Sequence, residues 1–205
     1  AAELVVGCGR QLMARQTFEP AAIDEVVLGC VMPGPDEANL ARTLALRLGI
    51  GNDVPAYTVQ RNCASGLQAL DCAAMEIAAN RAELVLAGGV ESMSHAPILY
   101  NNDMVNWLAA LNGAKTLGQR LAVFSKLRLK NFKPIIALLR GLSDPIVGLS
   151  MGQTAENLAY RFGISRAQMD AFAARSHQRL ANAQDKGHLQ EVEPLYDYTG
   201  HFYDN

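Results

Sequence analysis

Two kinds of hydrophobic pattern alternate along the chain as far as about residue 91. Helix-like spacing covers residues 1–16, 37–48 and 63–80, and short apolar runs typical of buried strands cover 25–31, 56–60 and 83–87. Gly49 and the Gly88-Gly89 pair follow two of these segments as natural stops. Helices that alternate with strands in this way predict an α/β fold with a largely parallel sheet.

The pattern changes beyond Glu91, where no strand-like run recurs for roughly a hundred residues. Ser165 and Gln168 form a capping box at the start of the clearest helix, which Gly187 should end, and a second helix is expected over 152–162. We therefore expect an α/β domain over 1–95 and an inserted, mostly helical loop domain over 96–192. Residues 193–205 should return towards the α/β domain.

Composition adds that the 205 residues are those of a globular chain, with 50% hydrophobic and 19% charged residues, which excludes disorder, collagen and coiled coil. Four cysteines without a CxxC pair predict neither a disulfide scaffold nor a metal site, and favour a reducing compartment. The chain shows no secretory leader at Ala1 and no run of 18 apolar residues. A cytoplasmic location is the resulting expectation.

Charge is unevenly distributed behind the net value of −2. Residues 104–143 contain seven Lys or Arg and no Asp or Glu, which gives +7, while 11 basic and 20 acidic side chains elsewhere give −9. Leu117, Leu121 and Phe124 share one helical stripe, and Lys126, Lys130 and Lys133 should gather on the far side. Pro134 should end that helix, and 135–139 should form the second arm of a helical hairpin.

Three interpretations of this basic hairpin remain open. It is a solvated face, a surface for a phosphate-rich ligand such as CoA, or a docking surface for a membrane or a partner protein.

The strongest sign of chemistry is Cys63, which follows a strand and a short polar turn at the expected start of a helix. Unpaired N–H groups at a helix N-terminus stabilise a thiolate, and they can also hold an oxyanion when that thiolate attacks a carbonyl. Ala64, Ser65 and Gly66 are small enough to admit a substrate. We interpret Cys8, Cys30 and Cys72 as buried apolar residues, and the nine-residue spacing of Cys63 and Cys72 argues against a disulfide.

Three segments, in this order and at these separations, resemble the thiolase family across essentially the whole chain. Asn62-Cys63-Ala64-Ser65-Gly66 is similar to the segment of the acylated cysteine, and 87–97 to the glycine-rich loop beside the active site. Residues 151–157, followed by 164–173, are similar to the loop-domain signature. The resemblance implies a layered thiolase-like α/β fold, here as an incomplete N-terminal half without its first strand.

The resemblance also implies an activity, that of an acyltransferase in fatty acid beta-oxidation. Such enzymes cleave 3-ketoacyl-CoA with CoA through an acyl-cysteine, and CoA and acyl-CoA are substrates, so no cofactor is expected. Cys63 would be the nucleophile, with its backbone N–H in the oxyanion hole. Met151 would wall the acyl pocket, and Ser150 stands where many thiolases have a histidine that contacts the pantetheine arm.

The chain departs from the family in its histidines. None of His95, His177, His188 or His201 lies in a motif that matches the activating histidine, and no second catalytic cysteine is found. Both ends have the character of a cut chain, so we expect these 205 residues alone to be unable to complete turnover. A biosynthetic acetoacetyl-CoA thiolase, a cysteine hydrolase that pairs Cys63 with His95 and a non-catalytic interaction fragment are the alternatives.

The resemblance extends to partners. Residues 113–121 are similar to the thiolase subunits of fatty-acid-oxidation multienzyme complexes. The resemblance to the thiolase family implies a homodimer or higher oligomer, a hydratase/dehydrogenase partner subunit and peripheral membrane contact through 104–143. No nucleic acid is expected.

Overall fold

The computed structural model describes residues 1–196 and 199–203, and it divides the chain into two compact units. The first, which we call the α/β unit, comprises Ala1–Met93 and Gly163–Asn205. The second, the loop unit, comprises Ser94–Phe162. Each unit is described by itself below.

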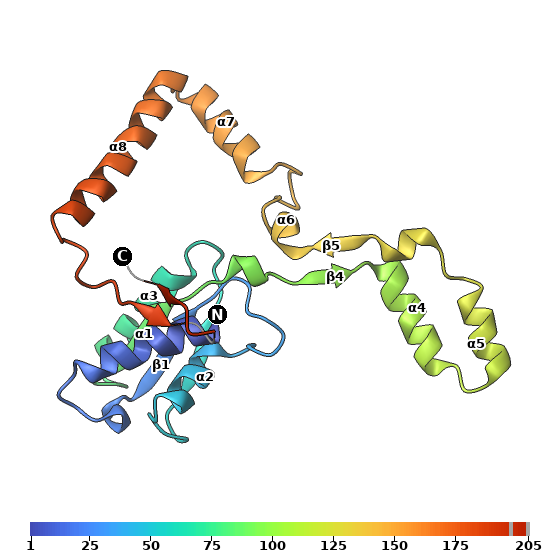
Figure 1. Ribbon diagram of the computed structural model, residues 1–205, viewed down its shortest axis with the longest axis horizontal. Helices are drawn as coiled ribbons and strands as arrows, with labels where there is room; N and C mark the ends of the chain where they lie inside the picture. Colours follow the sequence, from blue (N-terminus) through green and yellow to red (C-terminus); the bar gives the residue numbers. More distant parts are fainter. Residues whose placement is uncertain (197–198, 204–205) are drawn as a thin grey trace. The chain divides into compact units, whose positions relative to one another are not determined.

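The α/β unit contains a parallel three-stranded sheet of order β2-β1-β3. Its elements are α1 (Ala2–Ala14), the 3-10 helix η1 (Pro20–Ala22), β1 (Glu25–Gly29), α2 (Leu40–Arg47), β2 (Ala56–Val59), α3 (Ser65–Ala78), β3 (Val85–Gly89), α8 (Arg166–Asp185), β6 (Leu195–Tyr196) and β7 (Phe202–Tyr203). Val27 of β1 lies between Tyr57 of β2 and Ala87 of β3. The helices and strands expected up to residue 91 are therefore confirmed (Figure 1).

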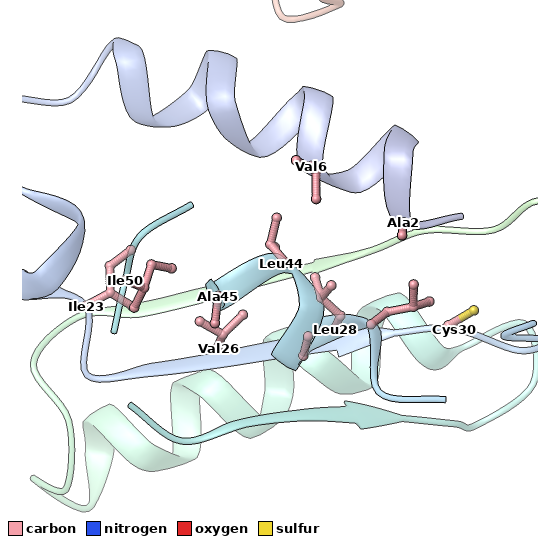
Figure 2. Packing of buried hydrophobic residues seen from close by; sticks show 11 residues of the cluster. Ala2, Val6, Ile23, Val26, Leu28, Cys30, Leu44, Ala45 and Ile50 are labelled. Atoms are coloured by element: carbon pink, nitrogen blue, oxygen red, sulfur yellow. The ribbon is translucent and has the colours of Figure 1, made fainter. Parts of the chain in front are cut away.

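The hydrophobic core of this unit lies between β1 and the two helices α1 and α2. Figure 2 shows Val6 of α1 and Leu44 of α2 on the same side of the sheet as Val26 and Leu28 of β1, and all four side chains are buried. Alternate residues of a strand point to opposite faces. Val27, which is fully buried but outside this cluster, therefore belongs to the face that α3 covers.

Several helices begin or end at residues that cap them. Ser165 accepts the backbone N–H of Gln168, and the Gln168 side chain accepts that of Ser165, which confirms the predicted capping box of α8. Gly49 and Gly187 have φ values of 73° and 65° at the predicted helix ends. Ser150 starts α7 (Met151–Arg161) with a further capping box, close to the helix predicted over 152–162.

The last strands of the α/β unit do not extend its parallel sheet. Strand β6 pairs antiparallel with β7 in a separate two-stranded ribbon. Leu195 packs against Gly7 of α1, and Arg15, the C-cap of α1, forms an ion pair with Glu193. This segment therefore joins the α/β unit through a helix rather than through the strand ladder.

The loop unit is mostly helical and also contains two three-residue strands that the sequence did not predict. Its elements are η2 (Met93–His95, which begins one residue before the unit), β4 (Ile98–Tyr100), α4 (Asn102–Gly113), α5 (Leu117–Phe124), η3 (Leu129–Phe132), β5 (Pro134–Ile136), α6 (Ala137–Gly141) and α7. Strands β4 and β5 pair antiparallel, with Leu99 opposite Ile135. Three-residue strands are too short to show an alternating pattern in the sequence, so they were missed.

The basic hairpin exists, but its two arms are α4 and α5. Trp107 of α4 donates its indole N–H to the Val123 carbonyl at 2.9 Å and meets the Phe124 ring edge-on, with centroids 5.4 Å apart. Asn101 holds the base of the hairpin by donating to three carbonyls, including that of Lys133 at 2.7 Å. The predicted second arm, 135–139, instead divides between β5 and α6.

The boundary expected near residue 95 and the observed division after Met93 lie close together, but the second limit differs. Helix α8 was expected in the loop domain and is grouped with the α/β unit. None of its residues is buried. The domain limits themselves stay a prediction. Across the described ranges, no helix is long and apolar enough to cross a membrane.

Candidate active site

Cys63 lies in the turn between β2 and α3, at the edge of the sheet where its parallel strands end. It is exposed, and α3 begins two residues later with Ala64 as its N-cap. Ligands of open α/β sheets bind outside the carboxyl ends of the strands. The sequence therefore placed Cys63 correctly near a helix start, although the thiol precedes the first helical turn.

A compact set of hydrogen bonds holds this turn in shape. Asn62 has a φ of 47°, the left-handed conformation that asparagine tolerates better than most residues. The Ser65 hydroxyl accepts the Arg61 N–H at 2.8 Å and donates to the Asn62 carbonyl at 2.7 Å. The Arg61 guanidinium also donates to Gln68 of α3 at 2.7 Å. Cys63 is thus presented from a turn that its neighbours on both sides fix.

Ser65 corrects one expectation about the space around Cys63. The sequence suggested that Ser65 leaves room for a substrate, but it is 3% exposed and both of its hydrogen-bonding roles serve the turn. A buried hydroxyl that makes two hydrogen bonds is a structural part of the site. Its signal in the sequence is a small polar residue two positions after the candidate nucleophile.

Glycines seat the start of α3 directly on the strand ends. A Cβ on Gly29, the last residue of β1, would lie 2.3 Å from the Ser65 carbonyl carbon and oxygen. A Cβ on Gly89, the last residue of β3, would lie 3.2 Å from the Gly66 Cα. Only residues without a side chain permit this approach. The height of Cys63 above the sheet therefore depends on Gly29 and Gly89.

Glu91 is a second residue that the sequence did not single out. Its carboxylate accepts the backbone N–H groups of Val31 at 2.8 Å, Met32 at 3.3 Å and Ser92 at 3.3 Å. It thereby joins the loops that follow β1 and β3. An acidic residue two positions beyond the Gly88-Gly89 pair was the available signal.

The remaining cysteines divide into different environments. Cys30 is buried, as expected, and burial together with the nearby Glu91 carboxylate raises the pKa of its thiol. Cys72 is half-buried on α3. Cys8 is exposed, so its interpretation as a buried apolar residue is wrong. All four thiols are free in the structure, those of Cys63 and Cys72 included.

Ser150 and Met151, the predicted substrate-binding residues, belong to the loop unit. The Ser150 hydroxyl accepts the Gln153 N–H at 3.3 Å as the N-cap of α7, and Met151 is the first residue of that helix, with its side chain exposed. His95, the partner of Cys63 in the hydrolase alternative, lies in the same unit. The contribution of Ser150 and Met151 to an acyl pocket stays a prediction. Within the described ranges, no group of three His, Cys, Asp or Glu side chains is placed to hold a metal ion.

Comparison with known proteins agrees with this geometry. The family model described as "Thiolase, N-terminal domain" matches residues 1–199. Among curated proteins, 3-ketoacyl-CoA thiolase of Escherichia fergusonii is 41% identical over 187 residues, which are 91% of this chain and 42% of that protein. The trifunctional enzyme subunit beta of mouse mitochondria is 38% identical over 184 residues, 90% of this chain and 38% of that protein.

Solved structures give the same result. An acetyl-CoA acetyltransferase of Bacillus anthracis aligns with a TM-score of 0.79 and 36% identity, covering 96% of this chain and 45% of that one. Human mitochondrial 3-ketoacyl-CoA thiolase in complex with CoA aligns with a TM-score of 0.77 and 34% identity, covering 95% and 45%. The chain therefore spans less than half the length of these relatives, and the layered α/β fold expected from the sequence is confirmed.

Proposed function

Because the chain belongs to the thiolase family, we propose that the protein is an acyltransferase that cleaves 3-ketoacyl-CoA with CoA, with Cys63 as its nucleophile. The observation that carries this proposal is the exposed Cys63 in a fixed turn at the carboxyl edge of the sheet, in a chain 41% identical to a 3-ketoacyl-CoA thiolase. The degradative direction, in fatty acid beta-oxidation, follows the names of the relatives and is part of the proposal.

The proposed reaction has two stages in which Cys63 gains and then loses an acyl group. The thiolate attacks the ketone carbon of 3-ketoacyl-CoA, the adjacent carbon–carbon bond breaks, and the acetyl-CoA carbanion takes up a proton and leaves. The sulfur of free CoA then attacks the acyl-cysteine and restores the thiolate. The backbone N–H of Cys63 would stabilise the oxyanion in the attack.

We also propose that these 205 residues alone do not complete the cycle. The resemblance assigns activation of the nucleophile and protonation of acetyl-CoA to a histidine and a second cysteine that no motif of this sequence supplies. The chain matches only 42% of the length of its bacterial relative, which is consistent with such groups lying elsewhere. Sustained production of acetyl-CoA from a 3-ketoacyl-CoA by the purified chain would contradict this proposal.

Acyl transfer to Cys63 is the step that tests the site. After incubation of the chain with acetyl-CoA, we expect peptide mass spectrometry to find one acetyl group on Cys63. Its rate should exceed that at the exposed Cys8 by about tenfold or more, since a nucleophile at a prepared site outpaces a surface thiol. The Cys63→Ala chain should lose this adduct, and equal labelling of both cysteines would contradict the proposal.

A second proposal concerns the hairpin in the loop unit, which we assign to docking. Leu117 of α5 and Leu129 of η3 are 75% and 92% exposed, in a segment of charge +7. Exposed apolar side chains among basic ones suit an anionic lipid surface. The name of the mouse relative, a subunit of a trifunctional enzyme, supports a partner subunit as the other occupant to test, and the family resemblance implies that this partner is a hydratase/dehydrogenase. A homodimer or higher oligomer and a cytoplasmic location stay predictions.

A further inference from the structure

The side chain of Glu91 continues the link between β1 and β3 past the point where the strands end. Within the ladder the last backbone hydrogen bond runs from the Val90 N–H to the Gly29 carbonyl at 3.0 Å. Beyond it, the Glu91 carboxylate accepts the N–H groups of Val31, Met32 and Ser92. The hydrogen bonds of this one side chain thus take the place of backbone hydrogen bonds between the two strands.

This link joins the two strand ends on which α3 rests. Gly29 and Gly89, the residues in close approach to Ser65 and Gly66, stand two positions before Val31 and Glu91. A change in the distance between the two loops would therefore act two residues away from the glycines that contact the start of α3. The turn that carries Cys63 is bonded to the same helix start through the Ser65 hydroxyl.

We propose that Glu91 is a positioning residue for Cys63, acting through the ends of β1 and β3 and the first residues of α3. The inference rests on the proposed function for the role of Cys63 but not for the mechanical coupling. Glu91 does not act on the substrate: it fixes the height and the order of the nucleophile's turn.

Cys30 supplies a fourth donor to the same carboxylate. Its Sγ lies 3.8 Å and 3.9 Å from the two Glu91 oxygens, within the range of a thiol hydrogen bond. Because burial raises the pKa of Cys30, the thiol keeps its proton and donates it. Four donors that converge on one side chain require an acceptor with two oxygens and a negative charge.

Hydrogen exchange tests the coupling directly. In Glu91→Gln, an amide replaces one acceptor oxygen with a donor that faces the N–H groups of the loop, so amides 31–32 should exchange faster. If Glu91 positions the turn, amides 61–66 should also exchange at least about fivefold faster, while those of α2 keep their wild-type rates. The matched control is Glu83→Gln, an exposed residue just before β3, which should alter neither segment.

The outcomes separate the inference from the proposed function. Faster exchange at 31–32 with unchanged exchange at 61–66 would overturn the inference, as would a uniform rise across α2. Cys63 acetylation by acetyl-CoA should fall at least about threefold in Glu91→Gln relative to the Glu83→Gln control. If the wild-type chain takes no acetyl group, acylation of Cys63 by these 205 residues alone is excluded, and the exchange result still decides whether Glu91 controls the turn. Glu91→Asp, a shorter carboxylate, should show an intermediate effect and serves if the amide variant does not fold.

Discussion

At the scale of single residues, Glu25 places a carboxylate where burial disfavours its charge. One oxygen of its carboxylate is buried and, among the described residues, has no hydrogen-bond partner. Burial, and then the negative charge of Glu76, raise the pKa of the Glu25 carboxyl. Burial, and then the negative charge of Glu25, raise the pKa of Tyr57 to about 12, so that this phenol stays protonated.

The sign of the pH dependence follows from that shift. A carboxyl whose pKa is higher in the folded than in the unfolded chain binds its proton more tightly when folded. Its stabilising contribution is complete below the usual glutamate value of about 4.3 and is lost as the pH rises through the raised pKa.

Glu25→Gln should therefore stabilise the α/β unit at neutral pH by about 1 kcal/mol. It removes a buried negative charge from a carboxylate in which one oxygen has no hydrogen-bond donor among the described residues. At pH 4 the two chains should differ little. Urea unfolding followed by far-UV circular dichroism at both pH values measures this difference. Glu83→Gln, at an exposed position, should change stability by less than about 0.5 kcal/mol. An equal effect of Glu25→Gln at pH 4 and pH 7 would show that charge is not the cause.

At the scale of elements, the contact between β1 and the start of α3 determines the position of Cys63, the proposed nucleophile. Gly29→Ala puts a Cβ 2.3 Å from backbone atoms of Ser65, and backbone cannot move aside without shifting the helix. We expect a loss of about 3 kcal/mol in the free energy of unfolding, at the upper end for overpacked sites, and a loss of Cys63 acetylation.

Gly88→Ala is the matched control for this prediction. The Cβ it adds would lie 3.7 Å from the Leu28 side chain, an ordinary contact, on a neighbouring residue of the same sheet. It should leave stability within about 1 kcal/mol of wild type. Chemical denaturation and acetylation rates of both variants measure the contrast. Similar losses in the two would mean that the sheet tolerates no alanine here for a reason other than the approach of α3.

At the scale of the whole molecule, charge and burial divide between the two units. The α/β unit holds the large apolar core, whereas the loop unit buries few side chains, among them Met104 and Asn131, and carries the +7 segment. A unit with a small core, excess positive charge and exposed leucines is suited to contact another surface.

The docking proposal predicts binding to vesicles that depends on charge. The chain should sediment with phosphatidylglycerol vesicles and not with phosphatidylcholine vesicles, and binding should fall with salt. Replacing the exposed Lys126 and Lys133 by Glu should reduce binding at least about tenfold, because each basic residue near such a surface contributes about 1 kcal/mol. Lys186→Glu, in the α/β unit, should have little effect. Equal sedimentation with both lipids would contradict the electrostatic proposal, and binding to neither would favour a protein partner.

The sequence by itself determined the main helices and strands of the α/β unit up to residue 91 and the position of Cys63 between a strand and a helix. Buried strands such as 25–31 and caps such as Ser165 carry their signals within a few residues, because apolar periodicity and helix ends are local properties. The same holds for Cys63 after its strand. The sequence did not predict the ribbon of β4 and β5, because each strand has only three residues and pairs with a strand more than thirty residues away.

Only the tertiary structure decided how the site is supported. That Gly29 meets Ser65, and that Glu91 holds the loop after β1, depends on which strands are neighbours, and no local pattern records this. The burial of Ser65 and the exposure of Cys8 likewise follow from what packs on each residue. Local sequence specifies what a residue can do, but the contacts between distant segments determine which of those roles it takes.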